Sequence, residues 1–188
     1  MSFLLDTNAY FLLFQYPRPS SYFHLVQHIK AENTVSFYIS EITSLEIHSV
    51  LGKYRRGSPS QRQQCGREII AGNTITQCSN TWIHHGRRKM KPKVFRAIQK
   101  LISDIEAKRG NTRATVLKVD LASVQKARDL LLRYADRYSF GSHDALIAGS
   151  LVVARQVRGM DLTLVTSDKG FKAVLRDETI PFYDPSLP

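Results

Sequence analysis

The sequence is poor in cysteine, and its two residues of this type, Cys65 and Cys78, are too few for a disulfide framework or a four-ligand zinc site. The six histidines do not supply a zinc site either, because no spacing among them provides a third ligand. Long apolar runs are also missing. The longest, residues 145–154, is interrupted by Gly149 and Ser150 and is far below the roughly 20 residues that span a bilayer. No basic leader precedes the first apolar run, so we expect a cytoplasmic protein without a membrane segment.

Acidic residues are also few. Lys and Arg outnumber Asp and Glu by 27 to 16, and the formal net charge of +11 indicates an anionic partner, either nucleic acid or an acidic protein. Residues 53–93 contain ten Lys or Arg and the single acid Glu68, a net charge of +9. At 188 residues, with 43% hydrophobic content, we expect one domain over residues 1–188 with a basic insertion at about 53–93. Within the insertion, residues 62–70 are predicted to be helical and residues 75–83 to be extended.

Strand-like and helix-like segments alternate along the rest of the chain. Strands are expected where apolar residues form short or alternating runs, and helices where they recur at helical spacing. The predicted strands are residues 3–5, 34–40, 115–119, 162–165 and 179–183, and the predicted helices are 7–16, 20–31, 43–54, 92–110, 121–138, 142–158 and 171–175. Such alternation predicts an α/β fold, a three-layer α/β/α sandwich with a mainly parallel central sheet.

Four acidic residues stand beside apolar segments that can deliver them to one edge of this sheet. Asp6 follows the first strand, at the carboxyl end where open parallel sheets place their ligands. Glu46, Asp144 and Asp168 have comparable settings farther along the chain. Converging carboxylates repel one another, and Mg²⁺ or Mn²⁺ is the usual compensation because these hard cations prefer oxygen ligands. We therefore predict that these four acids are catalytic and bind the metal.

Four motifs around these acids resemble those of PIN-domain ribonucleases, and most closely the VapC-type toxins. They are Asp-Thr-Asn at 6–8, Ser-x-Ile-Thr-x-x-Glu at 40–46, His-Asp-Ala-Leu-Ile-Ala-Gly at 143–149 and Thr-Ser-Asp-x-x-Phe at 166–171. The resemblance covers about residues 2–50 and 115–184. It implies a PIN-like fold and a metal-dependent endoribonuclease, in which one or two metal ions assist in-line attack of water and leave a 5′-phosphate and a 3′-hydroxyl. It also implies an inhibitory antitoxin and a homodimer.

The acids have a structural alternative as well. Asp after a strand is a good helix N-cap, and Glu in a first turn interacts favourably with the helix dipole. Asp120 also follows a strand and precedes a helix, but it matches no acid of the family pattern and is assigned to capping. Thr7 and Thr166 are predicted to orient the carboxylates or bound water from a second layer around the site. His143 is assigned a surface or capping role.

The basic insertion has two interpretations that the sequence leaves open. It is either an arm that grips RNA beside the acidic groove or a solvated loop. Trp82, with His84 and His85, either stacks on bases or anchors local packing. The residues predicted to bind RNA are Arg55, Arg56, Arg87, Arg88 and Lys89.

The long basic spacer between the second and third motifs departs from the toxin pattern. A housekeeping PIN ribonuclease in RNA processing is therefore the nearer alternative to a toxin. A PIN-like module that binds RNA without cutting is another, although such modules typically lose acids and all four are present. A receiver-type phosphoacceptor does not fit, because it would have paired acids after the first strand and Asp6 is followed by Thr7 and Asn8.

Overall fold

The computed structural model describes residues 2–71 and 74–187. The chain divides into two compact units, a larger one of residues 1–48 and 98–188 and a smaller one of residues 49–97. All four predicted acids belong to the larger unit, and the smaller unit contains the basic insertion. The single domain expected from the sequence stays a prediction.

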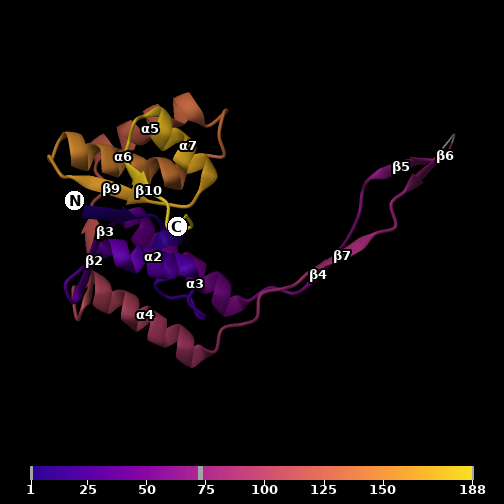
Figure 1. Ribbon diagram of the computed structural model, residues 1–188, viewed down its shortest axis with the longest axis horizontal. Coiled ribbons are helices and arrows are strands. Elements are labelled where there is room, and N and C mark those ends of the chain that lie inside the picture. Colours follow the sequence, from indigo (N-terminus) through magenta and orange to yellow (C-terminus); the bar gives the residue numbers. More distant parts are fainter. Residues whose placement is uncertain (1, 72–73, 188) are drawn as a thin grey trace. The chain divides into compact units, whose positions relative to one another are not determined.

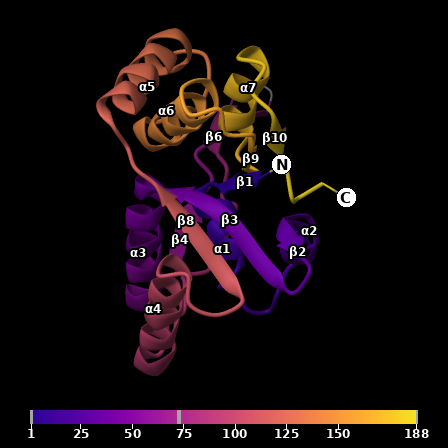
Figure 2. The same cartoon turned by 90° about the vertical axis from the view of Figure 1, so that its left-hand side faces the viewer.

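The larger unit is built on one sheet, in which neighbouring strands follow the order β10-β9-β1-β3-β8 through parallel pairs. The strands are β1 (Ser2–Leu5), β2 (Lys30–Ala31), β3 (Thr34–Ser40), β8 (Thr112–Leu117), β9 (Leu162–Val165) and β10 (Phe182–Tyr183). The short β2 pairs antiparallel with the start of β3. Leu5 pairs with Ile39 on one side and Val165 on the other, so β1, β3 and β9 end together at one edge (Figure 2).

Helices cover both faces of the sheet (Figure 1). The helices of the chain are α1 (Thr7–Leu12), α2 (Ser20–Ile29), α3 (Glu41–Arg56), α4 (Pro92–Glu106), α5 (Leu121–Tyr134), α6 (Ser142–Gln156) and α7 (Lys169–Asp177). On one face, Leu4 and Leu164 join a buried core with side chains of α5, α6 and α7. Helices α1 and α2 contact β1 and β3 on the other. The predicted α/β/α fold with a mainly parallel sheet is confirmed. Among the described residues, no helix is long and apolar enough to cross a membrane.

The strand boundaries show where local pattern and pairing agree. The predicted strands 34–40 and 162–165 match β3 and β9. Strand β8 starts three residues before the predicted 115, because it pairs with β3 along its whole length from Val35 and Thr112 onward. Strand β10 is shorter than predicted, since its register with β9 joins Phe182 and Tyr183 alone. The limits of a strand depend on the strand with which it pairs, and a single segment does not reveal that partner.

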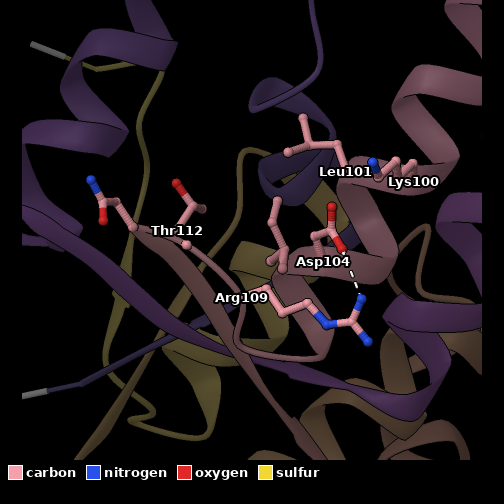
Figure 3. A pocket seen from close by; sticks show the side chains of 8 residues that line it. Lys100, Leu101, Asp104, Arg109 and Thr112 are labelled. Atoms are coloured by element: carbon pink, nitrogen blue, oxygen red, sulfur yellow. Dashed lines mark hydrogen bonds and ion pairs between the residues drawn. The ribbon is translucent and has the colours of Figure 1, made fainter.

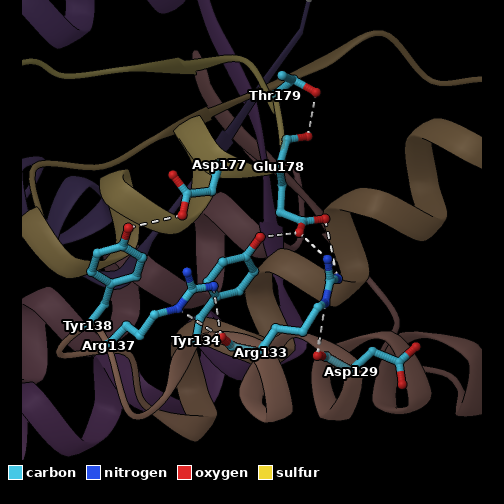
Figure 4. Close-up of polar contacts among 8 residues, drawn as sticks. All are labelled: Asp129, Arg133, Tyr134, Arg137, Tyr138, Asp177, Glu178 and Thr179. Carbon is cyan, nitrogen blue, oxygen red and sulfur yellow. Dashed lines mark hydrogen bonds and ion pairs between the residues drawn. The ribbon is translucent and has the colours of Figure 1, made fainter.

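Two contacts fix the helices that surround the acidic residues. Gly149 of α6 lets α5 approach closely, because a Cβ there would lie 2.3 Å from Ser123 O. The carboxyl ends of α5 and α7 are joined by a polar network (Figure 4), in which Tyr134 Oη donates to Glu178 Oε1 at 2.5 Å. Arg133 forms an ion pair with the same carboxylate. These contacts hold α6 and α7, which begin beside the predicted acids.

The smaller unit contains an antiparallel ribbon formed by two chain segments, each of which has two short strands. Its strands are β4 (Gln61–Gln64), β5 (Glu68–Ala71), β6 (Thr74–Gln77) and β7 (Thr81–His84). Strand β4 pairs with β7, and β5 pairs with β6. Between these pairs, Cys65 N donates to Asn80 O at 2.8 Å and Cys78 N donates to Arg67 O at 2.9 Å, which continues the same register. Both cysteines are free thiols.

The helix predicted at residues 62–70 is therefore wrong, whereas the extended structure predicted at 75–83 agrees with β6 and β7. The segment contains Ile69 and Ile70, and its partner contains Ile75 and Ile83, which are β-branched residues that fit a pleated ribbon. Strand β4 pairs with β7 across the intervening β5 and β6, so the periodicity of the segment alone does not reveal the pairing.

Candidate functional site

Asp6 leaves β1 at the carboxyl edge of the sheet and is nearly buried, with 4% of its surface exposed. Its Oδ1 accepts a hydrogen bond from Ala9 N at 2.6 Å, which caps α1. Burial raises the pKa of Asp6 to about 7, against hydrogen bonds from Thr166 and Ala9, and the charges of Asp144 and Asp168 add to the rise. Such a carboxyl is part-protonated at neutral pH unless a cation compensates its charge.

Asp144 stands in the first turn of α6, where its Oδ2 accepts a hydrogen bond from Gly141 N at 3.2 Å. Burial raises the pKa of Asp144 above its ordinary value, although the Gly141 hydrogen bond opposes the rise. The charges of Asp168 and Glu46 raise this pKa further, and His143 opposes them. Asp144 thus interacts electrostatically with each of the other three predicted acids.

Asp168 follows β9 and caps α7, because Phe171 N donates to its Oδ1 at 2.8 Å. The backbone N–H of Asp168 donates to Thr166 Oγ1 at 3.1 Å. The buried Thr166 side chain also forms a hydrogen bond with Asp6. Thr166 therefore joins the acid that follows β1 to the acid that follows β9.

Glu46 lies in the second turn of α3, with 30% of its side chain exposed. The Thr7 hydroxyl donates a hydrogen bond to Glu46 Oε2. His143 Nδ1 lies 3.1 Å from Glu46 Oε1. The Glu46 carboxylate is therefore held between a neighbour of Asp6 and a neighbour of Asp144.

The four acids predicted from the sequence are thus brought together in the larger unit. The alternative that these acids cap helices is also correct in part, because Asp6 and Asp168 cap helices through Oδ1. Each carboxylate has a second oxygen, so capping does not exhaust its hydrogen-bonding or ligand capacity. Asp120, assigned to capping alone, does cap α5, since its Oδ1 accepts from Ser123 N at 2.9 Å.

The chemistry of this cluster fits a hard divalent cation, since its donors are carboxylate oxygens. In the part of the chain that the structure describes, no three His, Cys, Asp or Glu side chains are grouped so that they could hold a metal ion. Mg²⁺ does not need such a cage, because it usually binds through one or two carboxylates and keeps water and substrate phosphate as its other ligands. The residues therefore fit Mg²⁺ or Mn²⁺ bound through a subset of the four acids.

His143 is one contact that the sequence did not indicate. It is exposed, as a surface role predicts, but its ring reaches Glu46 rather than only the helix end. The two residues lie 97 positions apart, so no local pattern could have paired them.

Asp184 is a further acid at this edge of the sheet that was not predicted from the sequence. It follows β10 and is buried, and it accepts a hydrogen bond from Ser167 Oγ at 2.7 Å and another from Ser186 N at 2.9 Å. Burial works to raise the pKa of Asp184, but an ion pair with Lys172 and these hydrogen bonds hold it well below the ordinary value. The signal was the one that identified Asp6, an acid directly after a strand.

The larger unit also contains a cavity of about 460 Å³ that none of the four acids lines (Figure 3). It lies between the end of α4 and the start of β8, with Leu101 and Thr112 in its lining. The Arg109 guanidinium pairs with Asp104 there at 3.4 Å. Lys100 also lines the cavity, so its lining has two cations and one acid, whereas the other cluster consists of acids.

The five residues predicted to bind RNA lie in the smaller unit. The Arg87 guanidinium lies over the Tyr54 ring, 4.6 Å from its centroid. Arg55 Nη1 donates to Met90 O at 3.3 Å. The other three are exposed, namely Arg56, Arg88 and Lys89. Their contact with RNA stays a prediction.

Several solved structures share the architecture of this chain. A chain of FitAcB from Neisseria gonorrhoeae is 16% identical, with a TM-score of 0.57 over 99% of both chains. A chain of DNA-bound VapBC from Salmonella typhimurium is 19% identical, with a TM-score of 0.51 over 98% of both chains. The fold is that of these PIN-like proteins. A chain of a toxin–antitoxin complex from Klebsiella pneumoniae is 16% identical, with a TM-score of 0.51 over 98% of both chains. No protein family and no curated protein matches the sequence.

Proposed function

We propose that this chain is a metal-dependent endoribonuclease and the toxin of a toxin–antitoxin pair. The proposal rests on one observation, the cluster of Asp6, Glu46, Asp144 and Asp168 at the carboxyl edge of a mainly parallel sheet. A cluster in which burial and mutual repulsion raise carboxyl pKa values stores an electrostatic cost that a bound cation removes. Structural capping alone does not require the four acids to converge.

The four acids would hold one or two Mg²⁺ or Mn²⁺ ions. When bound, such ions neutralise the phosphate, activate a water nucleophile and stabilise the leaving 3′ oxygen. Thr7 fixes the Glu46 carboxylate by donating to Oε2, and Thr166 fixes Asp6 and the backbone of Asp168. These hydroxyls limit the rotation of the carboxylates and so preserve their orientation around the substrate phosphate.

The partners follow from the structural neighbours. The Klebsiella pneumoniae structure is described as a toxin–antitoxin complex, and FitAB and VapBC are described as bound to DNA. We propose that a cognate antitoxin binds this chain and inhibits the acidic site, and that the chain works as a homodimer. The net charge of +11 supports RNA as the substrate, since a polyanion is attracted to a basic protein.

A non-cutting RNA-binding module is the second candidate. The observation in its favour is that no three potential ligands in the described residues are grouped to hold a metal ion. The two candidates differ in what remains after incubation with RNA. The nuclease converts single-stranded RNA, in the presence of Mg²⁺, into fragments with a 5′-phosphate and a 3′-hydroxyl, because water is the nucleophile. Intact RNA after incubation with Mg²⁺ and Mn²⁺ supports the module, and 2′,3′-cyclic phosphate ends contradict attack by water.

Arg87, Arg88 and Lys89 provide a test of the basic insertion as an RNA-gripping arm. Each phosphate contact on a single strand contributes about −0.7 to the slope of log affinity against log salt, so replacing all three by Ala should flatten the slope by about 2. Cleavage at saturating RNA should change little, since none of the three belongs to the acidic cluster.

The matched control removes the same charge from the larger unit, through Lys118→Ala, Lys126→Ala and Arg128→Ala. This control variant should leave the salt slope closer to the native value. An unaltered slope and affinity in the Arg87, Arg88 and Lys89 variant would show that these residues do not hold the substrate, and their charge would then favour an acidic protein partner.

A further inference from the structure

One face of the β4–β7 ribbon gathers an aromatic pair. Gln63 pairs with Trp82, and Gln61 pairs with His84. Because alternate residues of a strand lie on the same face, Trp82, His84 and Gln63 share one face of the ribbon, while Arg62 and Ile83 occupy the other. The aromatic rings therefore form a single surface.

A hydrogen bond fixes the orientation of these rings. Trp82 Nε1 donates to His84 Nε2 at 2.8 Å, and His84 Nε2 also lies 3.0 Å from Gln63 Oε1. The two rings stand edge to face, with an interplanar angle of 81°. A tryptophan that only anchored local packing would be largely buried, but 43% of Trp82 is exposed. The ring is thus both oriented and open to a ligand.

The charge of the segment selects the ligand. Residues 53–93 have a net charge of +9, and Arg87 and Arg88 follow β7 within four residues of His84. An acidic protein would satisfy this charge, but the carboxylates that do so provide no stacking surface for the oriented indole. Single-stranded nucleic acid supplies both a polyanionic backbone and unstacked bases, which is the combination that stacking platforms bind.

We propose that the Trp82, His84 and Gln63 face is a base-stacking platform for single-stranded RNA. The inference deepens the proposed function and rests on it for the choice of RNA, since it names the strand form that the nuclease binds. Double-stranded RNA keeps its bases stacked inside the helix, so it cannot use the platform. The platform therefore selects single-stranded regions of a substrate, while the arginines contact phosphates.

The single tryptophan of the chain makes this testable in the full-length protein, because Trp82 is then the sole source of indole fluorescence. We would titrate the native protein in EDTA with a single-stranded RNA of about a dozen nucleotides. The comparison is an abasic ribose–phosphate oligomer of the same length and charge. The platform predicts that RNA quenches Trp82 and that the abasic oligomer leaves its emission nearly unchanged. Equal quenching by both oligomers, or by a polyglutamate peptide of the same charge, overturns the platform.

Variants give a second measure that does not depend on fluorescence. Trp82→Ala should weaken RNA affinity about tenfold, whereas Trp82→Phe, which keeps a stacking ring, should lose much less. Ile83→Ala, on the opposite face of the same strand, is the matched control and should bind as the native protein does. Trp82→Ala with unchanged affinity overturns the platform.

The outcomes separate this inference from the proposed function. Cleavage of RNA by a protein whose Trp82 is not quenched retains the nuclease and removes the platform. Quenching by RNA without any cleavage retains the platform and removes the nuclease.

Discussion

Replacing Asp6 by Asn is expected to abolish RNA cleavage and, at the same time, to stabilise the metal-free protein. Asn removes one charge from the cluster that includes Asp144 and Asp168. It preserves the size of the side chain, and it is as good a helix N-cap as Asp. Loss of a metal-binding carboxylate should reduce cleavage at least 100-fold, an effect on the order of 3 kcal/mol in the transition state.

The stability gain depends on pH in a defined direction. The pKa of Asp6 is about 7 in the folded protein and 3.8 in its ordinary setting. Between these values the folded state keeps a proton that the unfolded state releases, so the free energy of unfolding falls as pH rises. The full cost of ionising the buried Asp6 carboxyl is present above pH 7. Asp6→Asn removes this cost, on the order of 4 kcal/mol at about pH 8, and the gain should shrink toward zero near about pH 4.

Urea unfolding in EDTA at several pH values measures this gain, and RNA cleavage with Mg²⁺ measures the loss of activity. Asp120→Asn is the matched control, because Asp120 also caps a helix but is exposed and lies outside the cluster. It should leave cleavage unchanged and show no such gain. If Asp6→Asn instead lost stability by about 1 kcal/mol and still cleaved RNA, Asp6 would be a cap and nothing more.

The sequence predicted the acids that follow strands because both parts of that signal are local. Asp6 directly follows a short apolar run, Asp168 follows another after two polar residues, and parallel strands bring their carboxyl ends to one edge. Asp184 gave the same signal after the last strand, but no family motif drew attention to it. The structure distinguishes it physically, since Lys172 compensates the charge of Asp184, whereas no cation among the described residues pairs with Asp6.

Contacts between distant segments could not be predicted in the same way. The Thr7 and His143 contacts with Glu46 span 39 and 97 positions, and they depend on how three helices begin around the sheet edge. The ribbon of the smaller unit was predicted only in its second half, residues 75–83, for a related reason. Its strands have few buried side chains, so they lack the apolar alternation that identifies a half-buried strand.

Mg²⁺ is expected to raise the melting temperature of the native protein but not that of Asp6→Asn. A cation that binds only the folded state stabilises it by about 2.7 kcal/mol at a hundredfold excess over Kd. For a chain of this size, that corresponds to a rise of roughly 5 to 10 °C. A cation at the cluster would also offset the burial and the repulsion that raise the pKa values of Asp6 and Asp144, which is why the effect should need the native cluster.

The most direct test is therefore a set of melting curves for the native protein, Asp6→Asn and Asp120→Asn, each in EDTA and in Mg²⁺, with RNA cleavage followed in the same solutions. If the acidic cluster binds the metal, Mg²⁺ stabilises the native and Asp120→Asn proteins, leaves the melting temperature of Asp6→Asn unchanged, and is required for cleavage. Equal stabilisation of all three proteins would place the cation elsewhere, and full cleavage in EDTA would contradict a metal-dependent nuclease.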